Sequence, residues 1–180
     1  FCHFAFYFSL FAIYLKFHNN FSENEMSTKS IRIQFFFDAA FILGMSGALQ
    51  GIFTPDFKHI HNYLGIICAQ LQHSLIILNV FWLMSAYKMR LKFHGAVYTY
   101  IFINLLVPFA ILLNIFLGTN ASGDFSNYLY IMELPNVDNF LLDFVLDKTF
   151  PNFILYVQPL IIVYILVLYL PFFILNRFKK

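Results

Sequence analysis

The sequence predicts an all-α fold, a polytopic transmembrane helix bundle with about five membrane helices, and its composition and hydropathy pattern predict it. Of 180 residues, 61% are hydrophobic and 11% are charged, and the mean hydropathy is +0.73. A soluble domain carries about 25% charged residues. The apolar residues also gather in runs of roughly 20, enough to cross about 30 Å of hydrocarbon. Aromatic residues make up 21%, which suits rings at the membrane interface.

Each apolar run gives one predicted helix. The first covers residues 1–17 and begins inside an apolar run without an initiator methionine, so we expect the chain to be truncated at its N-terminus. The second covers residues 33–53 and is stopped by Pro55. The third and fourth cover 65–87 and 95–117, with a proline-induced kink expected in the fourth at Pro108, and the fifth runs from Pro151 to the basic C-terminus.

The long loop at 118–151 holds an amphipathic piece around residues 140–146. No repeat or linker interrupts the chain, so we expect one transmembrane domain over 1–180. The strip formed by Gly44, Gly47, Ala48 and Gly51 is expected to let another helix approach closely. Asp38 in the second helix is expected to relay protons or to pair with a polar neighbour. The asparagines expected to form hydrogen bonds between helices are Asn79, Asn104 and Asn114.

The distribution of basic residues predicts the orientation in the membrane. Nine of the eleven Lys and Arg residues fall in the segments 16–32, 88–92 and 177–180. Basic residues accumulate in cytoplasmic loops. We therefore expect a multi-pass protein of the cell membrane with its C-terminus in the cytoplasm, and with the loops at 54–64 and 118–151 outside.

Charge and cysteine content exclude several function classes. A net charge of +2 is too small and too scattered for nucleic-acid binding, so membrane lipid is the expected partner, while the oligomeric state stays open. Cys2 and Cys68 alone cannot form a disulfide framework. His59 and His61 with Asp56 have the chemistry of zinc ligands, but residues two apart do not share a helix face. We therefore predict no metal site and no cofactor.

Polar side chains inside a membrane are costly and mark candidate functional positions. Here they come near the outer ends of four predicted helices, which favours a pocket open to the outer leaflet. Gln70 and His73 lie three residues apart and so share a helix face. The candidate pocket residues are Cys2, Gln50, Asp56, Gln70, His73 and Asn120.

Within this pocket, Cys2 and His73 have the chemistry of a nucleophile and its base. A thiol has a pKa of about 8.5, and a neighbouring imidazole increases the fraction of thiolate. The alternative is structural: cysteine is often a small buried hydrophobic residue, and a histidine in a membrane can simply bridge two helices. The residue types alone leave both interpretations open.

The segment Gly47-Ala48-Leu49-Gln50-Gly51-Ile52-Phe53-Thr54-Pro55-Asp56 resembles the YwaF-like integral membrane proteins of bacteria. Shorter matches follow at Gln72-His73, at Gly118-Thr119-Asn120 and at Phe140-Leu141-Leu142-Asp143, and Cys2 matches a cysteine that enters a helix in that family. The chain departs from the family at Ala121, where a Tyr is common, and at Phe150-Pro151-Asn152-Phe153, which replaces a Trp-rich stretch. The resemblance covers nearly the whole chain.

The resemblance implies a function in lipid metabolism. Eukaryotic transmembrane phospholipid acyltransferases that use a cysteine thioester are distantly similar to this family, and so are certain membrane lipid hydrolases. It implies Cys2 as the nucleophile and His73 as its base. In our functional hypothesis, Gln50 or Asn120 donates to the developing oxyanion. The expected function is therefore a lipid acyltransferase or hydrolase. The alternative is a non-enzymatic membrane protein, either a small-solute transporter subunit or a structural or assembly factor.

Overall fold

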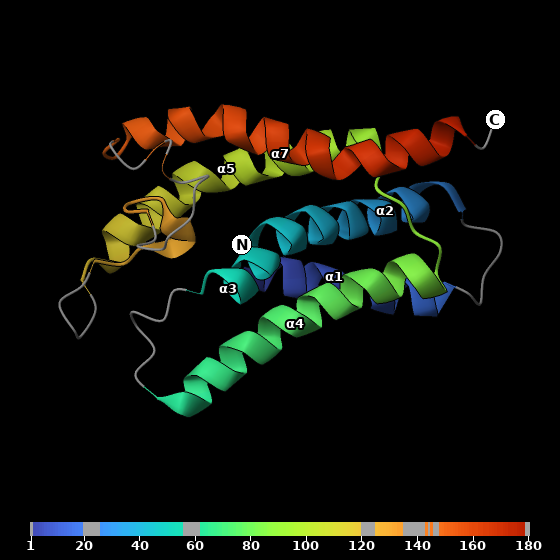
Figure 1. The fold of residues 1–180 in the computed structure, drawn as a ribbon, viewed down its shortest axis with the longest axis horizontal. Coiled ribbons are helices and arrows are strands. Elements are labelled where there is room, and N and C mark those ends of the chain that lie inside the picture. The colour runs from blue at the N-terminus through green and yellow to red at the C-terminus, as the bar shows by residue number, and fades with distance from the viewer. Residues whose placement is uncertain are drawn as a thin grey trace. The chain divides into compact units, whose positions relative to one another are not determined.

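The computed structural model describes residues 2–19, 26–55, 62–119, 125–134, 143, 145 and 148–178. For residues 19 and 26–29 it describes the backbone alone. Figure 1 shows the chain as a set of long helices. The all-α prediction is confirmed, because the described residues form helices and one isolated bridge between Thr119 and Phe125. The helices are α1 (Cys2–Asn19), α2 (Met26–Leu43), the π-helical turn η1 (Gly44–Ala48), α3 (Leu49–Phe53), α4 (Tyr63–Ala86), α5 (Phe93–Leu117), the 3-10 turn η2 (Tyr128–Tyr130) and α7 (Asn152–Arg177).

Four helical segments of the described chain are long and apolar enough to cross a membrane. They are Ser30–Phe53, Tyr63–Ala86, Phe93–Leu117 and Asn152–Arg177. The fifth predicted membrane helix corresponds to α1, which is a continuous helix of 18 residues. Within α5 the helix continues through Pro108. Most of the predicted amphipathic piece at 140–146 lies outside the described residues.

The chain forms two compact units. The first comprises Phe1–Thr99 with Ile165–Lys180, and the second comprises Tyr100–Tyr164. Both α5 and α7 are therefore divided between units. The described residues of the candidate site, Cys2, Gln50, Gln70 and His73, belong to the first unit.

Small residues bring α2, η1 and α3 close to α4. A Cβ added at Gly44 would lie 3.1 Å from Ile76 Cγ2 and 3.6 Å from Val80 Cγ2. Seven residues later, a Cβ added at Gly51 would meet His73. The contacts on α4 run backwards as the chain runs forwards, so the two segments are antiparallel. The small-residue strip thus allows the close packing expected of it at both glycines.

The helix α1 packs against α2 and α4. Rings join it to α2, with Phe11 and Phe36 in edge-to-face contact at 4.8 Å between centroids. Against α4 the contact is polar, because Asn79 Nδ2 donates to Ser9 Oγ at 3.1 Å and Ser9 is fully buried. The prediction that Asn79 bonds between helices is confirmed. Asn104 instead donates to Tyr100 O within its own helix, at 3.0 Å.

The ends of α3 and α4 follow local rules. Thr54 ends α3, with its backbone N–H 2.7 Å and its hydroxyl 3.1 Å from Gln50 O, and Pro55 cannot continue the helix. Asn62 is the N-cap of α4, and its side-chain oxygen accepts from the Gly65 N–H at 2.6 Å. Asparagine is a preferred N-cap because it satisfies a donor at the helix start.

The connector between α4 and α5 is held by Asp38. Its Oδ1 accepts from Gln34 Nε2 at 2.7 Å and from the Lys92 backbone N–H at 3.3 Å. Gln34 Nε2 also donates to Arg90 O at 2.9 Å. The buried carboxylate of Asp38 lies against Gly95, where an added Cβ would overlap it. Asp38 therefore pairs with polar neighbours and holds the start of α5 against α2.

In the second unit, α5 fixes the segment that follows it. Asn114 is buried; its Oδ1 accepts from the Tyr128 N–H at 2.7 Å, and its Nδ2 donates to Tyr128 O at 3.2 Å. Asn114 thus bonds a turn instead of a membrane helix. Tyr100 also donates its hydroxyl to Gln158 Oε1 at 2.8 Å, which links α5 to α7 inside this unit.

Candidate functional site

The imidazole of His73 packs directly on the backbone of Gly51. A Cβ added at Gly51 would lie 2.5 Å from Cε1, 2.8 Å from Nδ1 and 2.9 Å from Nε2 of that ring. Real Cβ contacts this short are essentially unknown, so the ring occupies the space that any side chain at 51 would need. Because Gly51 has no side chain, the His73 ring can lie directly against the backbone of α3.

Gln70 and Gln50 lie at the same junction. Gln70 Nε2 donates to Gly51 O at 3.3 Å, so Gln70 and His73 face α3 together from one side of α4. Gln50 immediately precedes Gly51, and its carbonyl accepts from Thr54. The structure thus brings Gln70 and His73 together on Gly51, and Gln50 is the residue that precedes this glycine.

The first turn of α1 reaches the same level. The helix α1 is antiparallel to α2, and α2 is antiparallel to α4, so α1 and α4 run in the same direction. From the bonded pair Ser9–Asn79, Cys2 lies seven residues back along α1 and His73 six residues back along α4. At 1.5 Å per residue, these steps are about 10.5 and 9 Å. Counted from this bonded pair, Cys2 and His73 are therefore at a similar level along the helix direction.

Cys2 and His73 lie on helix faces that point in different directions. Seven residues are close to two full turns, so Cys2 is on the same face of α1 as Ser9, which faces α4. His73 is about a third of a turn away from the Asn79 face and packs on α3. We call this junction of α1, α3 and α4 the three-helix corner; its residues are Cys2, Gln50, Gly51, Gln70 and His73.

One ring nitrogen of His73 is buried without a hydrogen bond. Its Nδ1 is buried and has no hydrogen-bond partner among the described residues. A buried polar atom without a partner costs about 1–3 kcal/mol and calls for an explanation. The corner therefore contains a half-buried thiol and a buried imidazole nitrogen without a hydrogen-bond partner among the described residues.

Two residues of the predicted pocket, Asp56 and Asn120, lie outside the described residues, as do His59 and His61. Thr119, the neighbour of Asn120, pairs with Phe125 through the isolated bridge. Within the described ranges, no cluster of His, Cys, Asp or Glu has the arrangement of a metal site.

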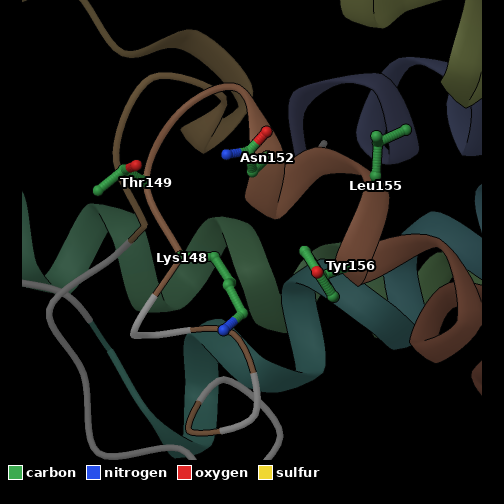
Figure 2. Close-up of a pocket in the computed structure, with 5 residues that line it drawn as sticks. All are labelled: Lys148, Thr149, Asn152, Leu155 and Tyr156. Carbon is green, nitrogen blue, oxygen red and sulfur yellow. The ribbon is translucent and has the colours of Figure 1, made fainter.

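A cavity of ≈ 500 Å³ lies at the start of α7, in the second unit. Figure 2 shows its lining, and the ammonium group of Lys148 is 5.3 Å from the centre of the Tyr156 ring. The other lining residues are Thr149, Asn152 and Leu155. The four described residues of the predicted pocket, Cys2, Gln50, Gln70 and His73, are not among those that line this cavity.

The sequence did not reveal the role of Gly51 at the site. It belongs to a small-residue strip typical of helix packing, and nothing in the strip distinguishes the glycine beneath a histidine from the glycine beneath Ile76. The useful signal was its position next to Gln50 at the end of a helix. That position identifies Gly51 as part of the site only when it is known which residues of α4 face α3.

Comparison with known families gives one match. The profile of the TMEM164 family matches residues 1–169, which is nearly the whole chain. It supports a TMEM164-like family of membrane proteins and does not confirm the narrower YwaF-like bacterial assignment. No curated protein and no solved structure matches the chain.

Proposed function

This multi-pass membrane protein belongs to the TMEM164 family, and we propose that it is a lipid acyltransferase or lipid hydrolase that works at the three-helix corner. Cys2 is the nucleophile and His73 its base. The observation that carries the proposal is the buried, unpartnered Nδ1 of His73, level with a half-buried cysteine on the neighbouring helix. A base needs a free lone pair, and a structural histidine would normally have both nitrogens bonded.

The proposed reaction proceeds in two balanced steps. His73 accepts the thiol proton, the sulfur of Cys2 forms a bond to the carbonyl carbon of a lipid ester, and the ester C–O bond breaks. The leaving alkoxide takes the proton from the imidazolium, which gives a lysolipid and a thioester on Cys2. A lipid hydroxyl or water then attacks the thioester carbonyl while His73 accepts its proton, and the C–S bond breaks to give the new ester or the free acid. The thiolate takes the proton back from the imidazolium, which restores the thiol. The choice between hydroxyl and water separates the transferase from the hydrolase.

The remaining residues of the predicted pocket have supporting roles in this proposal. Gln50 or Asn120 donates to the oxyanion, a contact worth about 3 kcal/mol when well placed. Gln70 and Asp56 contact the lipid headgroup. The acyl chain enters sideways from the outer leaflet, and the exposed apolar side chains of α4, including Ile67 and Leu71, offer lipid contact beside the corner.

We also propose the orientation that the basic residues indicate, in the cell membrane with a cytoplasmic C-terminus. The described cations of the first unit support it, since α1, the α4–α5 connector and α7 carry Lys16, Arg90 and Arg177. The corner then lies at the outer end of α1 and close to the middle of α4, where His73 is the eleventh of 24 residues.

An acyl-exchange assay tests the proposed function. The full-length protein in lipid nanodiscs receives a phospholipid with a labelled acyl chain and an unlabelled lysolipid, and mass spectrometry follows the label. We expect transfer or release by wild type and a loss of about 10²–10⁴-fold in His73→Ala. Turnover that persists at the wild-type rate in His73→Ala, or no turnover by wild type with any ester lipid, would contradict the proposal and favour the non-enzymatic alternative.

A further inference from the structure

The connector between α4 and α5 has an alternating pattern of burial. Residues Lys88, Arg90 and Lys92 are exposed, whereas Met89 and Leu91 between them are buried. The apolar side chains thus anchor the segment in the first unit, and all three cations lie on its outer side. We call residues 87–92 the basic strap.

The strap is fixed along its length. Gln34 bonds the carbonyl of Arg90 at 2.9 Å, and Asp38 accepts from the backbone N–H of Lys92 at 3.3 Å. At its start, the Met89 N–H donates to Leu83 O at 3.2 Å. These bonds involve backbone groups and leave the cationic side chains on the surface. The backbone that carries the cations is thereby held in place before any ligand arrives, which lowers the entropic cost of binding.

The strap lies at a membrane surface, because it joins the end of one apolar helix long enough to cross a membrane to the start of another. Exposed Phe93 follows it directly, and aromatic rings are enriched at membrane interfaces. Arg32, two residues before Gln34 on α2, adds another exposed cation. Among the described residues of the first unit the single carboxylate is Asp38, which is fully buried.

We propose that the basic strap binds the headgroups of anionic phospholipids in the leaflet at this end of the helices. Clustered Lys and Arg beside a membrane helix attract anionic lipid, and no exposed carboxylate in the described part of this unit offsets them. The headgroup phosphate meets Lys88, Arg90 and Lys92, and the acyl chains lie along the exposed apolar side chains of α4 and of residues 93–99 of α5, which belong to the same unit. This binding does not depend on the catalytic proposal.

Lipid retention tests the strap. The full-length protein in mixed micelles is titrated with phosphatidylserine and, separately, with phosphatidylcholine, and native mass spectrometry measures bound lipid. We expect wild type to prefer phosphatidylserine. The triple variant Lys88→Gln, Arg90→Gln, Lys92→Gln should bind it about a hundredfold more weakly, because each cation at the surface contributes about fivefold. Raising the salt from ~0.1 M to ~1 M should weaken wild-type binding as well, because the screening length falls from about 10 to 3 Å.

The matched control preserves charge: Lys88→Arg, Arg90→Lys, Lys92→Arg should retain the preference. Both triple variants keep Met89, Leu91 and the backbone bonds, so circular dichroism should show wild-type helix content. Equal retention of phosphatidylserine by wild type and the glutamine variant would overturn the proposal. So would equal binding of the two lipids by wild type, or complete displacement of the lipid by millimolar inorganic phosphate, which would identify a soluble anion as the ligand.

Discussion

Gly51 has two structural effects because it lacks a side chain. It lets α3 approach α4 closely, and it leaves the space that the His73 ring occupies. The sequence predicted the residue types of the corner, since a Cys, a His and two Gln near helix ends are unusual in apolar spans. It could not predict which backbone position the imidazole would rest on. That depends on the rotation of α4 about its axis, which packing sets and hydropathy does not encode.

A double-mutant cycle tests this contact. We expect Gly51→Ala to reduce the free energy of unfolding by about 1–3 kcal/mol, because the new Cβ would lie 2.5 Å from His73 Cε1. In a His73→Ala background the same change should cost much less, and the difference is the coupling energy. Thermal unfolding in detergent measures it.

The control for the cycle is Gly44→Ala, whose Cβ would meet Ile76 at 3.1 Å and not His73. Its cost should be the same in both backgrounds. An identical cost of Gly51→Ala with and without the imidazole would show that the ring does not rest on Gly51.

Hydropathy predicted the bounds of some helices closely and missed the ends of others. The third and fourth predicted helices, 65–87 and 95–117, agree closely with α4 and α5, because apolar runs and stop signals coincide there. The second was expected to begin at 33, but α2 begins at Met26. Hydropathy marks the part of a helix that lies in hydrocarbon, and polar turns beyond it can stay helical at the surface. The π-helical turn η1 had no signal beyond its glycines.

The contact between α2 and the strap had no sequence signal either. Asp38 was expected to relay protons or to pair with a polar neighbour. It pairs with Gln34 one turn earlier in α2, and also with a backbone N–H 54 residues away in sequence. The adjoining Gly95 is required because any side chain there would overlap the carboxylate. Hydrogen exchange is the natural measurement for such a bond, since it reports local opening.

We expect Asp38→Ala to speed hydrogen exchange at the Lys92 amide, because the acceptor of its hydrogen bond is removed. Asp38→Asn is the matched control. It keeps one oxygen that can accept from Lys92, so its exchange should stay closer to wild type. Exchange at Lys92 that is unchanged in Asp38→Ala would mean that the carboxylate does not hold the strap.

At the scale of the whole molecule, composition alone was enough for the fold class, because a chain with 61% hydrophobic residues cannot bury its apolar surface without lipid. The family match over residues 1–169 agrees with a membrane protein. Whether the chain is one domain stays a prediction. The positions of Asp56 and Asn120 also stay predictions, because they depend on loops whose apolar content is too low to fix their path from sequence.

The orientation can be tested at the strap. A single cysteine at position 90, in a chain with Cys2→Ser and Cys68→Ser, should react with a membrane-impermeant maleimide only after the cells are opened. The expectation follows from the basic segments on this side of the membrane, and Arg90 is exposed. Labelling of intact cells would reverse the proposed topology.

The thioester on Cys2 is the central claim, and covalent labelling tests it most directly. The full-length wild-type protein is incubated in nanodiscs with a reactive acyl probe, and the modified residue is identified by mass spectrometry. We predict a hydroxylamine-sensitive adduct on Cys2, strongly reduced labelling in His73→Ala and none in Cys2→Ser. Cys68→Ser, which removes the exposed cysteine of α4, should label like wild type. Labelling that persists in Cys2→Ser, or that disappears in Cys68→Ser instead, would contradict a nucleophilic Cys2.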